Sequence, residues 1–347
     1  MVIEAFSSRM LSGLTCGADG SAAPVMIIGA TGLVGRHLVA VLKAAGAKVI
    51  LVRRGAWGEE SADVPTRLSA NLQEPEEIRR MAVHAVALGC RAVVLAVHPT
   101  LGAAFAEALA AQCGLSGADE GSPAVVAFSS TRVLSRVDID GSPAAVRAAE
   151  ARLLACGLRG VVLRPTMIHG IGDRSLSRLA AWGRRGVVLL PGGGRVRVAP
   201  VHAWDVARAV ALALVQPWPC DEAMQVVTLS GEASTLAHII GLQAVVEGRR
   251  PPWVLGVPRW PGVPLKLLAR VVRGGRIVSL AASYGRAFED RAPGHDDASR
   301  LLGWEPMPPN VALRLTAAES RQVGLGAAIA RAVSGADRLW WEHLPAI

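Results

Sequence analysis

A glycine-rich turn with the spacing G-x-x-G-x-x-G lies in the stretch "PVMIIGATGLVGRH" at 24–37. An apolar run leads into it and a helical pattern follows. Gly29 permits a tight turn, Gly32 lets the backbone approach a phosphate, and Gly35 lets the helix pack closely on the strand. The helix N-terminus offers free N–H groups and the positive end of its dipole to a diphosphate. The stretch predicts a dinucleotide-binding site; a glycine turn that serves packing alone is the alternative.

The end of the next apolar run indicates which dinucleotide the site prefers. The segment "KVILVRRG" at 48–55 ends in Arg53 and Arg54, where NAD sites usually place an acidic residue that holds the ribose 2′-hydroxyl. Guanidinium groups instead attract a 2′-phosphate and form charge-assisted hydrogen bonds with it. The two arginines therefore favour NADP(H). If one of them merely faces solvent, the other remains for this role.

The elements that must position these residues follow from the apolar pattern. Short apolar runs alternate with helical patterns as far as about residue 165, which is typical of βαβ units in a parallel sheet. Strands are predicted at 25–30, 49–52, 68–72, 92–97, 125–129 and 161–163, and helices at 33–45, 75–85, after Pro99, 142–155, 204–215 and 234–246. We predict an α/β protein with a doubly wound parallel sheet and a smaller C-terminal domain.

Glycine and proline become denser after residue 165, which suggests where the domains divide. We expect a mobile N-terminal extension at 1–20 and a nucleotide-binding domain at 21–170 that is completed by about 196–230. The substrate-binding domain is then formed by 171–195 and 231–347. Five tryptophans of the C-terminal half suit the wall of an apolar pocket, or else they fill core. They are Trp253, Trp260, Trp304, Trp340 and Trp341.

Composition excludes several classes of function. The 347 residues are 51% hydrophobic and 19% charged, which is typical of a globular chain. The net charge is +9, but the arginines are spread along the chain without a basic cluster, so nucleic-acid binding is not expected. Five single cysteines have neither metal-ligand nor disulfide spacing. The sequence shows no convincing secretion signal or membrane span, and we expect a cytoplasmic protein with no metal and no membrane partner.

Four segments resemble the extended and atypical branch of the short-chain dehydrogenase/reductase superfamily. They are "GATGLVG" at 29–35, "AFSSTRV" at 127–133, "VVLRPTMIHGIGDR" at 161–174 and "VAPVHAWDVARAV" at 198–210, and "LLGWEP" at 301–306 resembles a C-terminal element of that branch. The resemblance implies a Rossmann domain, a smaller substrate domain and a site between them. The residues expected to contact the cofactor are Gly29, Thr31, Gly32, Leu33, Val34, Gly35, Arg53, Arg54, Asn71, Leu72, Ala96, Ser129, Pro165 and Thr166.

The resemblance breaks at the catalytic pair of that superfamily, Tyr-x-x-x-Lys. The corresponding helix reads "GSPAAVRAAEARLLACG", which places Ser142 and Val146, or Pro143 and Arg147, at the two positions. The only tyrosine of the chain is Tyr284, and the only lysines are Lys43, Lys48 and Lys266, so the pair occurs nowhere. In the superfamily the tyrosine protonates the carbonyl oxygen, and here another group must do so.

The candidates for catalysis are therefore few. Ser130 or Thr131 falls where the superfamily has a catalytic hydroxyl, although "SST" after a strand could also serve only to cap a turn. His98 is expected at the end of a strand that faces the cofactor. His169 stands where many relatives have tyrosine, and is more often structural at such a place. In the segment that contains His202, Asp205 is expected to cap the following helix.

Hydride transfer without this tyrosine remains possible for one class of substrate. A phenol beside an aromatic ketone polarises the carbonyl through its own hydrogen bond, and water or Ser/Thr can supply the proton. The pattern resembles atypical ketoreductases that tailor aromatic polyketide antibiotics, which implies a polycyclic aromatic ketone as substrate. A cofactor-binding sensor or scaffold without catalysis is the main alternative, and a sugar-nucleotide epimerase or dehydratase, which depends more on the tyrosine, is another. The sequence leaves the oligomeric state open.

Overall fold

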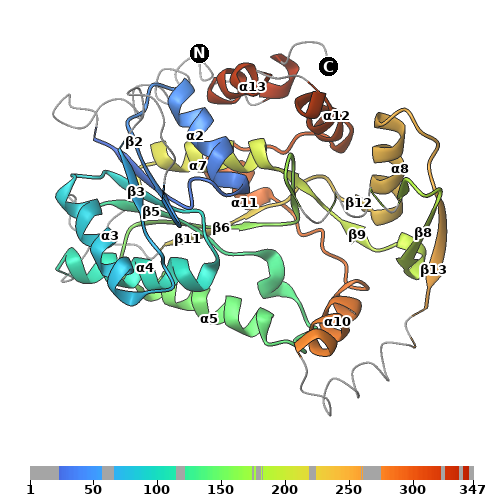
Figure 1. Cartoon of the computed structure of the whole chain (residues 1–347), viewed down its shortest axis with the longest axis horizontal. Coiled ribbons are helices and arrows are strands. Elements are labelled where there is room, and N and C mark those ends of the chain that lie inside the picture. The colour runs from blue at the N-terminus through green and yellow to red at the C-terminus, as the bar shows by residue number, and fades with distance from the viewer. Residues whose placement is uncertain are drawn as a thin grey trace.

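A computed structural model of the protein describes residues 23–56, 66–114, 122–173, 176, 181, 183–218, 224–258, 260, 275–321, 325–335 and 339–343. The extension expected at 1–20 lies outside these residues. Figure 1 shows a large central sheet with helices on both faces and a smaller group of elements beside it. No helix in the described part of the chain has the length and apolarity needed to cross a bilayer.

The central sheet of the described chain has seven strands, and every neighbouring pair is parallel. Its order is β11 (Gln225–Leu229), β6 (Gly160–Pro165), β5 (Ala124–Phe128), β4 (Ala92–Leu95), β1 (Val25–Ile28), β2 (Val49–Arg53) and β3 (Arg67–Ser69). The predicted doubly wound sheet of the Rossmann type is confirmed. Its first strand, β1, lies between β2 and β4, so the chain turns in opposite directions on its two sides.

Alternation along β1 assigns its side chains to two cores. Val25 and Ile27 face one core and Met26 and Ile28 the other, and all four are buried. Both faces must be covered by apolar helices, because a parallel strand of this kind is buried on each side. Figure 1 shows α2 (Leu33–Ala44) and α7 (Ala203–Val215) on one face and α3 (Pro75–Ala87), α4 (Pro99–Gln112) and α5 (Ser142–Ala155) on the other.

The C-terminal helices return to the α2 face of the sheet. They are α11 (Asp296–Leu302), α12 (Pro309–Arg321), α13 (Leu325–Ser334) and the short turn η3 (Trp340–His343). Trp304 and Trp340 are fully buried in the same core as Val25 and Ile27. These two tryptophans therefore fill core, as the alternative reading of the sequence held, and do not form a pocket wall. The domain division expected at 231 stays a proposal.

The smaller group of elements is built from short strand pairs. The elements are β7 (Ile168–His169) with β10 (Val201–His202), β9 (Arg197–Val198) with β12 (Ser234–Thr235), β8 (Val187–Pro191) with β13 (Trp253–Val257), the turns η1 (Thr131–Leu134) and η2 (Gly192–Gly194), and the helices α8 (Leu236–Val246) and α10 (Gly275–Arg286). Trp253 on β13 is 80% exposed and Trp260 71%. Among the five tryptophans singled out from the sequence, these two are the exposed ones.

Candidate cofactor and active site

A cavity of about 280 Å³ lies at the carboxyl ends of β1, β2 and β4. This is where an open α/β sheet binds a ligand, because the connections on either side of β1 diverge there. The expected cofactor residues that line it are Gly29, Thr31, Gly32, Arg53, Arg54, Asn71, Leu72 and Ala96, together with His98. The sequence did not single out six further lining residues, Ile28, Val52, Ala70, Gln73, Val97 and Leu101. Alternation within the strands is the signal that could have found Ile28 and Val52.

The glycine turn is shaped by contacts that leave no room for side chains. Gly29 has φ +84°, and a Cβ atom there would lie 2.4 Å from the carbonyl oxygen of Ala96. A Cβ atom on Gly35 would lie 2.1 Å from the carbonyl oxygen of Gly29. The turn therefore needs glycine at both positions, once for backbone conformation and once for close packing of helix on strand. The observed turn has the form that the spacing of the glycines suggests.

The N-terminus of α2 faces the same turn. Its cap residue is Gly32, which gives no side-chain cap, and the first turn contains no acidic residue. The first backbone N–H groups of the helix, from Leu33, Val34 and Gly35, therefore have no side-chain acceptor within the described chain, which suits a diphosphate. The Val34 side chain is buried in the core, so Val34 can serve a cofactor only through its backbone.

The two arginines at the end of β2 lie where the sequence predicts the adenosine part of a cofactor. Both line it, and Arg54 is exposed. The Arg53 Nε donates a hydrogen bond of 3.3 Å to the carbonyl oxygen of Arg54. Asn71 forms a turn, where its Oδ1 accepts a hydrogen bond of 3.3 Å from the backbone N–H of Gln73. The two guanidinium groups give this part of the cavity a positive charge.

The residues expected at the nicotinamide end lie beyond the cavity, at the ends of β5 and β6. The Thr131 hydroxyl donates a hydrogen bond of 3.3 Å to the carbonyl oxygen of Pro165. Thr166 is buried, and its hydroxyl is directed at the carbonyl oxygens of Ala199 and Leu229. Ser129 is buried, and its backbone N–H donates to Leu163 at 2.8 Å. Of these residues Thr131 is the half-exposed one, so its hydroxyl is best placed to reach a ligand.

His98 and Ser130 both cap helices. The His98 Nδ1 is 2.8 Å from the Thr100 hydroxyl and accepts a 3.4 Å hydrogen bond from the Thr100 backbone N–H, at the start of α4. The Ser130 hydroxyl accepts a 3.2 Å bond from the Arg132 backbone N–H at the start of η1. Burial, with a smaller effect from Arg132, lowers the pKa of His98. Its ring is then neutral near pH 7, with Nε2 as the protonated nitrogen.

Helix α5 contains neither a tyrosine nor a lysine. Ser142 is its first residue and Val146 is buried. Tyr284 lies on α10, where its hydroxyl donates to the Pro258 carbonyl and its ring meets Phe288. Lys43 stands in the last turn of α2 and Lys48 just before β2, whereas Lys266 lies outside the described residues. The structure brings neither described lysine to α5.

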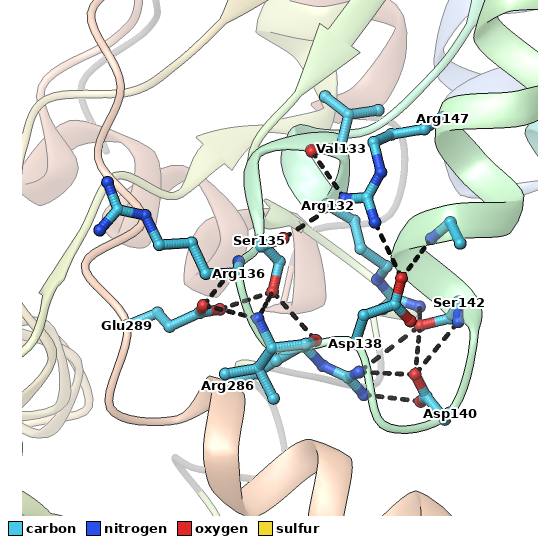
Figure 2. Close-up of polar contacts among 12 residues, drawn as sticks. Arg132, Val133, Ser135, Arg136, Asp138, Asp140, Ser142, Arg147, Arg286 and Glu289 are labelled. Atoms are coloured by element: carbon cyan, nitrogen blue, oxygen red, sulfur yellow. Dashed lines mark hydrogen bonds and ion pairs between the residues drawn. The ribbon is translucent and has the colours of Figure 1, made fainter.

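A polar network lies beside the N-terminal end of α5 (Figure 2). Asp140 accepts two hydrogen bonds from Arg286 of α10, at 2.8 and 3.0 Å, and one from the Ser142 hydroxyl at 2.8 Å. Glu289 accepts bonds from the Ser135 hydroxyl at 2.6 Å and from two backbone N–H groups of the same loop. Two acids before Ser-Pro are a helix-start signal, but nothing in the sequence points to α10 as their partner.

A buried histidine cluster lies behind the glycine turn, on the α2 face of the sheet. The imidazoles of His37, His169 and His202 contact one another or Trp204 edge to face. Burial lowers the pKa of His37 and of His169 to about 4 and places that of His202 well below 6.5. Among the described residues no group of His, Cys, Asp and Glu could hold a metal ion. The cluster is therefore a neutral, packed unit.

Asp205 is expected from the sequence to cap α7, and the structure corrects this expectation. His202 is the cap of α7, because its Nδ1 accepts a 3.2 Å hydrogen bond from the Trp204 backbone N–H. Asp205 is fully inside the protein, where its carboxylate accepts bonds from the Met307 N–H at 3.0 Å and the Trp340 Nε1 at 3.3 Å. Burial raises the pKa of Asp205 to about 7. The residue thus ties the C-terminal segment to α7, a contact that local sequence cannot reveal.

Comparison with known proteins agrees with the cofactor half of this site. Residues 25–100 match the model of the NAD dependent epimerase/dehydratase family. The matched segment runs from β1 to the start of α4 and so includes all the described lining residues of the cavity except Leu101. No curated protein matches the chain by sequence.

Solved structures share the fold at low sequence identity. The crystal structure of gox2253 is similar with a TM-score of 0.66 and 20% identity, over 88% of this chain and 99% of that chain. The epimerase Mth375 of Methanothermobacter thermautotrophicus has a TM-score of 0.64 and 14% identity, over 90% and 94% of the two chains. The UDP-glucose 4-epimerase of Brucella ovis, solved with NAD, has 0.60 and 18%, over 85% and 97%. These similarities show the fold alone.

Proposed function

We propose that the protein is an NADPH-dependent oxidoreductase of the extended short-chain dehydrogenase/reductase type, and that it reduces a ketone of a polycyclic aromatic polyketide. The observation that carries the proposal is the pairing of a built dinucleotide cavity with an α5 that lacks the tyrosine and lysine. The match of residues 25–100 to the NAD dependent epimerase/dehydratase family supports the cofactor class. Arg53 and Arg54 support NADPH over NADH, because their charge suits a 2′-phosphate.

The residues present fit a dinucleotide. Gly29 and Gly35 let the turn pack against the backbone of Ala96 and let α2 pack against the turn, and the N-terminus of α2 has no side-chain cap. Gly29 to Gly35 would hold the diphosphate, and Arg53 and Arg54 the adenosine phosphate. When bound, the reduced cofactor supplies a hydride to a carbonyl carbon. The chain's own task is to orient the ketone beside β5 and to keep its oxygen near the Thr131 hydroxyl.

The missing tyrosine restricts the substrate. A phenol beside the ketone would carry its own hydrogen bond to the carbonyl oxygen and give that oxygen a proton as negative charge develops there. The finer resemblance, to the simocyclinone ketoreductase that acts on an angucyclinone, motivates a fused aromatic ketone of this type. The exposed Trp253 offers an apolar surface for such rings. The protein is expected to act on this small molecule without a nucleic-acid or membrane partner, in the cytoplasm.

The alternative is a sensor or scaffold that binds NADP(H) without turnover, which the missing tyrosine and lysine also favour. Sugar-nucleotide chemistry is a weaker alternative: the similar MoeE5 was solved with UDP-glucose and NAD, yet this chain lacks the tyrosine base that such reactions need. The test uses NADPH with deuterium at C4 and a fused aromatic ketone that carries an adjacent phenol. Stereospecific deuterium in the product alcohol supports the proposal. NADPH binding without turnover on any such ketone would favour the sensor.

A further inference from the structure

The carboxylates labelled in Figure 2 are all engaged by partners. Asp140 holds the guanidinium of Arg286 through two hydrogen bonds, and Asp138 holds Arg147 at 2.8 Å. Glu289 is satisfied by the loop before α5, through one hydroxyl and two backbone N–H groups. The three carboxylates therefore already accept hydrogen bonds from these partners, and none of them forms an ion pair with Arg132 or Arg291 among the described residues.

Two arginines next to this network have no ion pair of their own within the described chain. The Arg132 guanidinium donates one hydrogen bond there, from Nη1 to the Ser142 hydroxyl at 3.4 Å, and the side chain is exposed. The Arg291 backbone N–H donates to the carbonyl oxygen of Arg197 at 2.8 Å, but its guanidinium makes no hydrogen bond with a described residue. Most of the donors on both guanidinium groups thus have no acceptor among the described residues, and a ligand could accept bonds from them.

Arg291 lies within reach of the charges of this network. Its side chain is exposed; burial lowers its pKa, the Glu289 carboxylate raises it, and the charges of Arg286 and Arg132, each with a smaller effect, lower it. Like charges at such a place repel one another, and a bound anion would relieve that repulsion.

The position of Arg132 connects this charge with the reaction. It follows Thr131 directly in η1, after β5, and its guanidinium bonds to Ser142, which together with Pro143 is one of the two candidates for the position of the superfamily's tyrosine. Its charge also acts on His98, which lines the cofactor cavity. Figure 2 shows Arg132 and Arg286 approaching Ser142 from different elements. The charge of Arg132 thus acts both on a residue of the cofactor cavity and on Arg291.

We propose that Arg132, supported by Arg291, is an anion-binding catalytic residue that takes the place of the missing tyrosine by holding the phenolate oxygen of the substrate. This inference rests on the proposed function and adds the group that stabilises its charge. During reduction the carbonyl carbon gains a hydride, the phenol O–H bond breaks, and its proton goes to the carbonyl oxygen. The phenolate that remains takes a proton from water after the reaction. A guanidinium beside that oxygen stabilises it until then.

The test measures ionisation of a bound phenol, without NADPH. The probe is 1-hydroxyanthraquinone, in which a phenol adjoins a ketone and ionisation changes the visible absorbance. In the unaltered protein the apparent pKa of the bound probe should lie about 1–3 units below its value in Arg132→Gln, because an opposite charge within a few ångströms favours the anion. Arg291→Gln should give a smaller shift in the same direction. Arg132→Lys, which keeps the charge, should retain most of the effect.

Arg136→Gln is the matched control, because Arg136 lies on the same loop and its side chain extends away from Ser142 in Figure 2. It should leave the probe's pKa unchanged. With NADPH and a reducible hydroxyketone, Arg132→Gln should lower kcat by about 10²–10³-fold, as the loss of an oxyanion donor does, and change KM less. Circular dichroism checks that each variant folds. If Arg132→Gln does not fold, Arg291→Gln decides through the same titration.

The outcomes separate this inference from the proposed function. An unchanged probe pKa in Arg132→Gln and Arg291→Gln, in a protein that still reduces hydroxyketones, overturns the role of Arg132 alone. The same follows if Arg132→Lys behaves like Arg132→Gln, since the effect is then not one of charge. A protein that neither binds the probe nor reduces any ketone overturns both.

Discussion

The imidazoles of His169 and His202 meet edge to face inside the protein, with ring centroids 5.0 Å apart. They come from β7 and β10, which pair in a register that sets the two residues opposite each other. The His202 Nδ1 accepts a bond from the Trp204 N–H, so its Nε2 carries the proton and donates to the Thr316 hydroxyl at 3.0 Å. Burial outweighs the smaller effect of the Asp173 carboxylate, which favours a charge on His169, so both buried rings are neutral near pH 7. The pair therefore makes folding sensitive to acid.

Stability should fall as the pH drops from about 6.5 to about 4. The folded pKa of His37 and of His169 is about 4, below the 6.5 of an unperturbed histidine. Their contribution to the free energy of unfolding is thus complete above pH 6.5. It is lost between pH 6.5 and pH 4, because in this range the histidines of the unfolded chain bind protons and the buried ones do not. Each of these histidines contributes about 3 kcal/mol at most. Urea unfolding at pH 7.5 and pH 5 measures the loss, and His37→Gln and His169→Gln should each reduce it.

The free energy of unfolding should be compared between variants at each pH, because ionisation of Asp205 changes stability with pH in the opposite direction. Its folded pKa of about 7 lies above the usual 3.8, so its contribution is lost as the pH rises. The difference between His37→Gln and the unaltered protein cancels this effect. His84→Gln, at the end of α3 and away from the cluster, is the control. A difference that does not change with pH would contradict the assignment of a depressed pKa to His37.

Replacement of Gly29 by alanine should damage both folding and cofactor binding. At φ +84° an L side chain costs about 1–2 kcal/mol, and the added Cβ atom also meets the Ala96 carbonyl at 2.4 Å. Gly89 has φ +61° with open space around it, so Gly89→Ala carries the backbone cost alone. Thermal unfolding should give a much lower Tm for Gly29→Ala than for Gly89→Ala. NADPH titration should show a loss of affinity for Gly29→Ala only. Equal effects would mean that the turn can relax.

NADPH should bind more tightly than NADH, and the preference should depend on Arg53 and Arg54. Both line the cavity at the end of β2, where a hydrogen bond to a charged phosphate contributes about 1.5–3 kcal/mol. The variant with alanine at both positions should lose NADPH affinity and keep NADH affinity. Fluorescence titration with each cofactor measures the selectivity. Arg79→Ala, on the exposed face of α3, is the control. Equal affinity of the unaltered protein for the two cofactors would refute the preference.

The elements of the sheet could be predicted because each one is specified locally. The apolar runs at 25–30 and 49–52 correspond to β1 and β2, and the helix expected at 142–155 is α5 with the same bounds. Buried parallel strands show as continuous apolar runs, and Pro143 marks the first turn of α5. The strand ends at 28 and 95 fall earlier than expected, because the chain turns at once into the glycine loop and toward His98.

The tertiary partners could not be predicted, because they join segments far apart in the chain. Asp205 reads as a helix cap, yet it binds the Met307 N–H about a hundred residues away. Nothing in the sequence around Glu289 indicates a partner, yet its carboxylate accepts a hydrogen bond from a backbone N–H of the loop before α5. The positive charge around Ser142 could likewise not be predicted, because the arginines are spread evenly along the sequence. A local pattern specifies an element, whereas packing selects its partner.

The last prediction concerns the source of the proton. If the substrate's phenol supplies it, Ser130→Ala, Thr131→Ala and His98→Ala should each lower kcat only modestly, although a positioned general acid contributes about 10²–10⁴-fold. Ser130 and His98 already cap helices, and Thr131 bonds to Pro165, so none is free of a structural task. Methylation of the adjacent phenol should reduce turnover more than any of these changes, with binding of the ether checked separately. An ether that reacts normally, beside one dead variant, would identify that side chain as the acid.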